Sequence, residues 1–79
     1  MTINEKIDYM IVALQLAKEE LDYKNEYIKL EKENDEKYAN DFYKKYDFYK
    51  KYRTPNKTFI RENLAMVGRI GFILAKDVK

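Results

Sequence analysis

Cysteine, histidine and tryptophan are absent from this chain of 79 residues, and glycine (two residues) and proline (one) are scarce. The absence of cysteine excludes disulfides, thiolate metal sites and thiol nucleophiles. The absence of histidine removes the commonest general base and the commonest metal ligand. Neither a catalytic triad nor a Cys/His metal site can be assembled from this composition, so the sequence predicts a protein that is not an enzyme.

Carboxylates are numerous, but their arrangement does not predict catalysis or metal binding. Glu19 and Asp22 stand three residues apart, as do Glu33 and Glu36, so each pair shares a helix face. No glycine-bearing calcium loop accompanies them, and acid–base use of two carboxylates needs a cleft that separates their pKa values. A chain this small offers little cleft. We therefore expect no catalytic, cofactor-binding or metal-binding residues and no small-molecule substrate.

Long apolar runs are also missing. The longest, residues 65–75, contains Arg69 and is shorter than the roughly 20 residues that a membrane-spanning helix needs. The first eight residues carry neither a basic segment nor a small-residue cleavage site of the kind found in signal peptides. We therefore expect a cytoplasmic protein without membrane association.

The first 54 residues contain no glycine or proline and predict helix. Thr2 and Glu5 have the spacing of a capping box, which marks a helix start. Apolar residues then recur at alternating steps of four and three, the pattern of an amphipathic or coiled-coil helix: Ile3, Ile7, Met10, Leu14, Ala17 and Leu21. We expect one helix over about residues 3–33 and a second over about 35–53.

Two arrangements of these helices are consistent with the sequence. One is a continuous rod over about 3–53, roughly 75 Å long, which would require a partner chain. The other is a hairpin that turns near Asn34-Asp35 or Asn40-Asp41, because Asn tolerates the left-handed conformation at a helix end and Asp caps the next helix. We favour the hairpin, because a monomer of this size gains little core from a rod.

The segment 53–57, Arg-Thr-Pro-Asn-Lys, is the clearest break in the chain. Thr54 or Asn56 is expected to cap the following helix, with Pro55 in its first turn. This helix is expected over about 58–76, where Gly68 and Gly71 either admit another helix closely or mark a turn.

The expected fold class is therefore all-α, with a single domain over 1–79. It would be a long helical hairpin plus a shorter C-terminal helix, forming a three-helix bundle, or an elongated coiled-coil dimer. The residues expected in its core are Ile7, Met10, Leu14, Leu21, Leu64, Val67 and Ile70.

A hexapeptide, Asp-Phe-Tyr-Lys-Lys-Tyr, occurs twice in succession over 41–46 and 47–52. At about 100° per residue, six positions rotate a helix so that the two copies face directions about 120° apart. Tyr38, Phe42, Tyr46 and Tyr49 would then share a face suited to core packing. The residues expected to contact a partner are Tyr43, Lys44, Phe48, Lys50, Lys51 and Arg53.

Charge is distributed unevenly, with a balance of −5 over residues 1–41 and +7 over residues 42–79. The asymmetry favours an acidic helix beside a basic one, within a hairpin or across a homodimer. It is also compatible with nucleic-acid binding by lysines and stacking aromatics in the segment 42–53.

The expected function is protein binding, with a second copy of the chain as one possible partner and nucleic acid as the alternative. Lysine, tyrosine, isoleucine and asparagine supply 34 of the 79 residues, and their codons are AT-rich. This bias suggests an accessory protein of a phage or mobile element in a low-GC bacterium, which binds and modulates a host protein.

Overall fold

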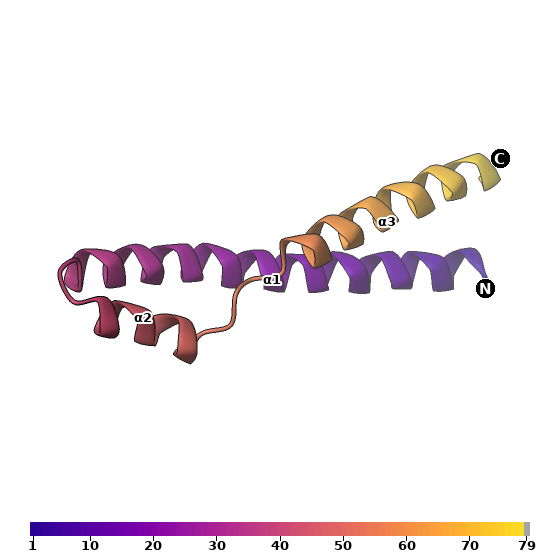
Figure 1. Cartoon of the computed structure of the whole chain (residues 1–79). Coiled ribbons are helices and arrows are strands. Elements are labelled where there is room, and N and C mark those ends of the chain that lie inside the picture. Colours follow the sequence, from indigo (N-terminus) through magenta and orange to yellow (C-terminus); the bar gives the residue numbers. More distant parts are fainter. Residues whose placement is uncertain (79) are drawn as a thin grey trace.

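The computed structural model describes residues 1–78 and contains three α-helices: α1 (Ile3–Lys37), α2 (Phe42–Lys51) and α3 (Lys57–Asp77). α1 runs the length of the molecule, and α2 and α3 lie one after the other along it (Figure 1). The two chain ends lie at the same end of the molecule (Figure 1). The all-α class and the helical hairpin predicted from the sequence are confirmed.

α1 begins where the sequence predicts and ends four residues later than expected. The Thr2 side chain caps the helix by accepting a hydrogen bond from the Glu5 amide at 3.1 Å. At the other end the Tyr38 amide donates to the Asn34 carbonyl at 2.9 Å. The helix therefore continues through Asn34-Asp35, the first of the two expected turn positions.

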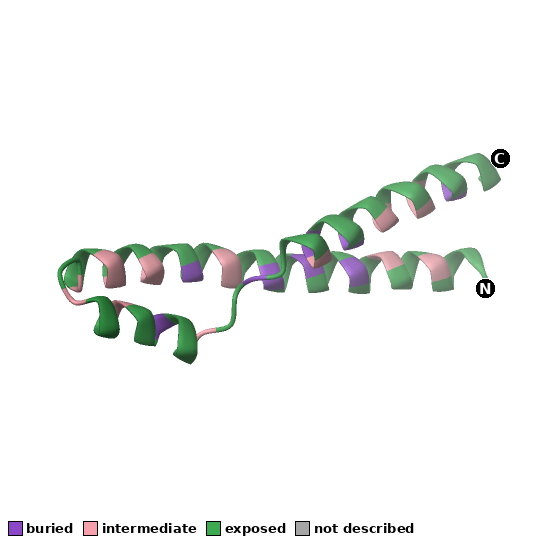
Figure 2. Ribbon diagram, viewed as in Figure 1, coloured by how far each residue is buried: buried purple, intermediate pink, exposed green. Residues whose placement is uncertain are grey.

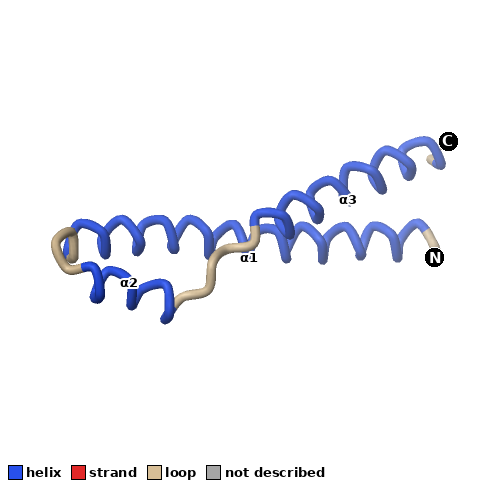
Figure 3. Tube along the Cα trace, viewed as in Figure 1, coloured by secondary structure: helices blue, strands red, loops and turns tan. Residues whose placement is uncertain are grey.

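The hairpin turns at the second position, between Tyr38 and Asp41 (Figure 3). Asp41 caps α2 by accepting from the Lys44 amide at 3.1 Å, which starts the helix at Phe42 and not near residue 35. The turn does not use the left-handed conformation expected of asparagine, since no non-glycine residue among those described has a positive φ.

The linker after α2 is fixed by the cap of α3. Asn56, one of the two expected caps, accepts a hydrogen bond from the Phe59 amide at 2.9 Å. Pro55 precedes this cap and is buried, so the prediction that it lies in the first helical turn is wrong. Proline lacks an amide donor and has a fixed φ of about −65°, both of which the linker position just before a cap can accommodate.

The molecule is only two helices thick, because α2 and α3 pack on different halves of α1 and not on each other. Its extents are 63 × 15 × 14 Å and its radius of gyration is 18.6 Å, against about 12 Å for a compact domain of this length. The expected three-helix bundle is thus a pair of two-helix layers joined end to end. No helix among the described residues is long and apolar enough to cross a membrane.

The buried face of α1 differs from the predicted one. Figure 2 shows a narrow buried line on α1 facing its partners, and this line contains Ala13, Ala17, Glu20 and Tyr27. Among the predicted core residues, Met10, Val67 and Ile70 are half-buried. The other four are wrongly assigned, since they are 40–49% exposed: Ile7, Leu14, Leu21 and Leu64.

Small side chains account for the choice of face. Ala13 and Ala17 let α3 approach α1 closely, whereas the leucines would hold it further away. Gly71 serves the same contact, because a Cβ at this position would lie 3.2 Å from Met10 Cε. The expectation that a glycine admits a neighbouring helix is met at Gly71, whereas Gly68 has no such neighbour within 4 Å.

Candidate protein-binding face

The structure divides the six predicted contact residues into two groups. Tyr43, Lys44, Lys50 and Lys51 are exposed on α2. Phe48 is only 6% exposed, and Arg53 is engaged with α1 through an ion pair. Phe48 therefore belongs to the packing between α1 and α2, whereas Arg53 lies in the linker after α2 and pairs with Glu20 while its side chain stays 60% exposed.

Phe48 anchors α2 on α1. Its ring lies 5.2 Å from that of Tyr27 on α1 and 4.8 Å from that of Tyr52 at the end of α2, measured between centroids. Further along the helix, the Asn34 side-chain amide donates to the Lys45 carbonyl at 3.0 Å. The Lys45 ammonium also lies 3.7 Å from the Asp35 carboxylate. These contacts orient α2 with Phe48 inward, in place of the face that the sequence favoured.

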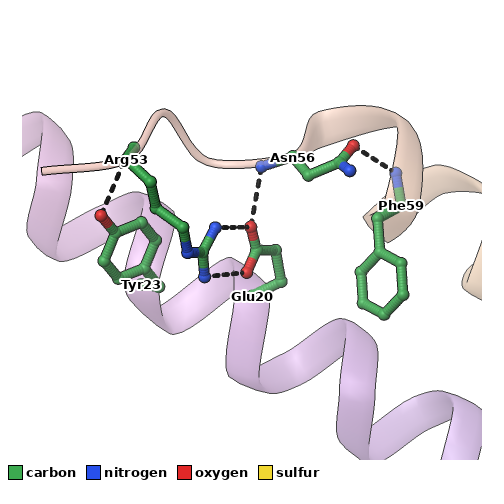
Figure 4. A network of polar contacts seen from close by, with 5 residues as sticks. All are labelled: Glu20, Tyr23, Arg53, Asn56 and Phe59. Atoms are coloured by element: carbon green, nitrogen blue, oxygen red, sulfur yellow. Dashed lines mark hydrogen bonds and ion pairs between the residues drawn. The ribbon is translucent and has the colours of Figure 1, made fainter.

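A polar cluster made of Glu20, Tyr23, Arg53 and Asn56 holds the linker against the middle of α1 (Figure 4). The two Arg53 guanidinium nitrogens donate to the two Glu20 carboxylate oxygens, each at 2.7 Å. Glu20 also accepts from the Asn56 amide at 2.7 Å. The Tyr23 hydroxyl donates to the Arg53 carbonyl at 2.7 Å, and the guanidinium stacks 4.2 Å from the Tyr23 ring centroid.

This cluster strongly favours the ionised form of Glu20. The bidentate hydrogen bond from Arg53, followed by the Asn56 amide, lowers the pKa of Glu20 from 4.5 to about 2. Bidentate pairing of this kind fixes geometry as well as charge. The cluster therefore sets where α2 ends and α3 begins, and sequence reasoning missed Glu20 and Tyr23 because neither is near Arg53 in the chain.

An exposed aromatic face on α2 remains after these assignments. It consists of Phe42, Tyr43, Tyr46 and Tyr49, all of them exposed. The Phe42 ring stacks on that of Tyr46 with centroids 5.8 Å apart, and Tyr46 lies 6.1 Å from Tyr49. The prediction that Phe42, Tyr46 and Tyr49 share a core-packing face is wrong, because Phe48 packs against α1 instead.

One edge of the aromatic face is close enough to α1 for a carboxylate of that helix to affect its titration. The pKa of Tyr49 is raised above its ordinary value, chiefly by hydrogen bonding to the Glu31 carboxylate and secondarily by the partial burial of the phenol. Tyr43 lies at the other edge and is 83% exposed. Exposure therefore increases across the face, from 43% at Tyr49 to 83% at Tyr43.

The basic residues of the segment 42–53 do not form a continuous positive track. Lys45 and Arg53 are paired with carboxylates of α1. The Lys44 ammonium lies 5.8 Å from the Tyr38 ring centroid, and that of Lys51 lies 5.4 Å from the Tyr52 centroid. In the part of the chain that the structure describes, Lys50 is the basic residue of this segment that has no ion pair or aromatic contact of this kind. It projects beside the aromatic face.

A groove of about 490 Å³ opens between α1 and α2 on the flank of α2 that carries Lys44 and Lys51. Apolar and amide side chains form part of its wall, and its charged residues are of both signs: Glu33, Lys37, Lys44, Asp47 and Lys51. Mixed charge gives the groove no strong field for a phosphate or another anion.

No group of three or more potential metal-ligating side chains gathers anywhere in residues 1–78. The aromatic face is therefore the feature of α2 with the most concentrated recognition chemistry. Comparison of the chain with protein-family models, curated proteins and solved structures gives no match.

Proposed function

We propose that this chain is a small, non-enzymatic protein-binding module that recognises another protein through the aromatic face of α2. The observation that carries the proposal is the exposed, mutually contacting row of Phe42, Tyr43, Tyr46 and Tyr49. Tyrosine is enriched among the residues that dominate protein interfaces, and its rigid ring gives a large contact area at a small entropic cost.

The way α2 is held supports this function. Phe48, the Asp41 cap and the Glu20 cluster fix both ends and the inner face of the helix. A partner would therefore meet a preorganised surface, which lowers the entropic cost of association. Lys50 beside the face would favour a partner with an acidic rim, and such a charge mainly accelerates association.

Nucleic acid is the less favoured ligand because two of the basic residues in 42–53 are paired within the chain. The composition of the sequence is rich in amino acids whose codons are AT-rich. On this ground we extend the proposal to a phage or mobile-element protein that binds a bacterial host protein.

The proposal is tested by capturing a partner on the immobilised chain and measuring its affinity for purified variants. Tyr43→Ala/Tyr46→Ala should weaken binding at least about 30-fold, since interface hot spots contribute 2 kcal/mol or more, without changing the melting temperature. Tyr9→Ala is the matched control, an exposed tyrosine on α1 that lies outside the face, and it should bind as the wild type does.

Two outcomes would overturn the proposal. One is unchanged affinity in the double tyrosine variant. The other is binding of a single-stranded or duplex oligonucleotide that weakens steeply with salt and disappears in Lys50→Glu/Lys51→Glu, which would instead establish the nucleic-acid alternative.

A further inference from the structure

The other half of the molecule, where α1 packs on α3, has its own uncovered surface. α1 presents Ile3, Ile7, Leu14 and Leu21 on one side, at heptad-like spacing and all exposed. α3 presents Leu64, Gly68, Gly71 and Ala75 at steps of four, three and four. The contact between Met10 and Gly71 shows that the two stripes border each other. Together they form one apolar face, called here the α1/α3 face.

We infer that a second copy of this chain covers the α1/α3 face, so that the two α1/α3 halves form an antiparallel four-helix bundle. The exposed area supports a partner of this size. The chain exposes 6566 Å², whereas a folded monomer of 9.6 kDa exposes about 5,100 Å². The excess of about 1,500 Å² per chain is what a permanent homodimer buries, since such interfaces remove about 2,000–5,000 Å² in total.

The opposite flank of α1 is less suited to a dry interface. It also carries exposed apolar residues, including Tyr9, Val12 and Leu16. At the same four-and-three spacing, however, this flank contains the carboxylates of Glu5 and Glu19, which an interface would have to desolvate. The α1/α3 face has no charged residue in either stripe, and Gly68 has open space above it for a close helix.

Charge selects the orientation of the second copy. Between residues 3 and 22, α1 carries five carboxylates and two lysines, whereas α3 carries four basic and two acidic side chains. If the two-fold axis of the dimer runs parallel to the helices, each acidic α1 lies beside the partner's basic α3. If the axis runs perpendicular to them, α1 lies beside the partner's α1 and α3 beside the partner's α3. The first arrangement is favoured, because opposite charges at an interface rim specify register and partner. It brings both α2 helices to the same end of the dimer.

Sedimentation equilibrium of the full chain tests the dimer. The wild type should have about twice the 9.6 kDa chain mass, and Leu14→Asp should be monomeric. The matched control is Leu16→Asp: the two leucines are 45% and 41% exposed on opposite flanks of α1, so this variant should remain dimeric. A monomeric wild type, a dimeric Leu14→Asp, or dissociation by Leu16→Asp as complete as that by Leu14→Asp would each overturn the inference.

A second variant separates dissociation from unfolding. Gly68→Lys places a better helix former at a position with open space in the single chain, so circular dichroism should show unchanged or higher helix content. The same substitution puts a charge into the dimer interface and should give a monomer. Ala65→Lys, on the outward side of α3, should stay dimeric. A dimeric Gly68→Lys would contradict the inference.

The absence of cysteine makes the orientation measurable with one introduced thiol. A spin label on Asn40→Cys, at the turn between α1 and α2, should give a label-to-label distance well below the 63 Å length of one chain. A distance longer than the chain would mean that the two copies point in opposite directions, and would refute the charge argument.

Discussion

Replacing Phe48 by alanine should detach α2 from α1. The side chain is 6% exposed and its ring contacts those of Tyr27, Tyr49 and Tyr52. Truncating a buried phenylalanine to alanine costs about 3–5 kcal/mol. We expect about 3 kcal/mol here, because the layer is open at its edges and α2 can move inward to fill part of the cavity.

This loss of stability should affect α2 and not the whole chain. α2 has 10 residues, and isolated helices shorter than about 12–15 residues are marginal in water. Without its anchor α2 should melt while α1 and α3 stay paired. Because α1 and α3 contain 35 and 21 residues, the helical signal at 222 nm should fall by about one seventh. Hydrogen exchange should show α2 amides losing roughly 100-fold in protection, the factor that about 3 kcal/mol represents.

The duplicated hexapeptide supplies the control. Phe42 occupies the equivalent position in the first copy, with the same neighbours in sequence, but is 72% exposed. Phe42→Ala should change the unfolding free energy by less than about 0.5 kcal/mol, as is usual for surface positions. Equal effects of the two substitutions, or a larger effect at Phe42, would show that α2 packs with its other face and would refute the assignment of the exposed aromatic face.

Two further predictions concern the polar contacts. Glu20→Gln should destabilise the fold at neutral pH. The difference in unfolding free energy from the wild type should narrow as the pH falls from about 4.5 towards about 2. The reason is that the lowered pKa of Glu20 makes its contribution to stability complete above pH 4.5, and this contribution is lost as the carboxylate is protonated. Urea denaturation across this pH range measures the gap, and a gap that stays constant down to pH 2 would contradict the role assigned to the ionised carboxylate. Asp41→Ala should cost about 1 kcal/mol as the loss of an N-cap, whereas Asp47→Ala, the equivalent position inside α2, should cost less than about 0.5 kcal/mol; equal thermal shifts would refute the capping role.

The course of the chain could be read from its sequence, because the signals that determine it are local. Thr2 and Asn56 cap the first and last helices as expected. Between residues 3 and 51, the stretch without glycine or proline is helical apart from one turn. For the position of the turn, the sequence leaves two alternatives, Asn34-Asp35 and Asn40-Asp41. The choice of Asn40-Asp41 over Asn34-Asp35 depends on contacts that Asn34 and Asp35 make with Lys45 on α2, which sequence alone does not give.

The packing face could not be read in the same way. α1 is apolar over more than one flank, so periodicity permits several orientations, and the one adopted follows the small side chains of Ala13 and Ala17. Glu20 sits on this buried line as a charged residue, which hydropathy would place outside. In α2 the two copies of the hexapeptide offer equivalent aromatics at different angles. Phe48 packs against α1 and Phe42 does not, because the distance of Phe48 from the turn places its ring against that of Tyr27.

The tandem hexapeptide has a consequence for how this chain can change over time. Because the two copies face about 120° apart, Phe48 is held by the fold while Phe42 is free of it. Substitution of Phe42 therefore changes the outer surface of α2 at little cost to stability, whereas substitution of Phe48 removes a packing contact. The duplication over residues 41–52 has thus placed the same residue type under two different constraints: one phenylalanine is needed for packing, and the other can change.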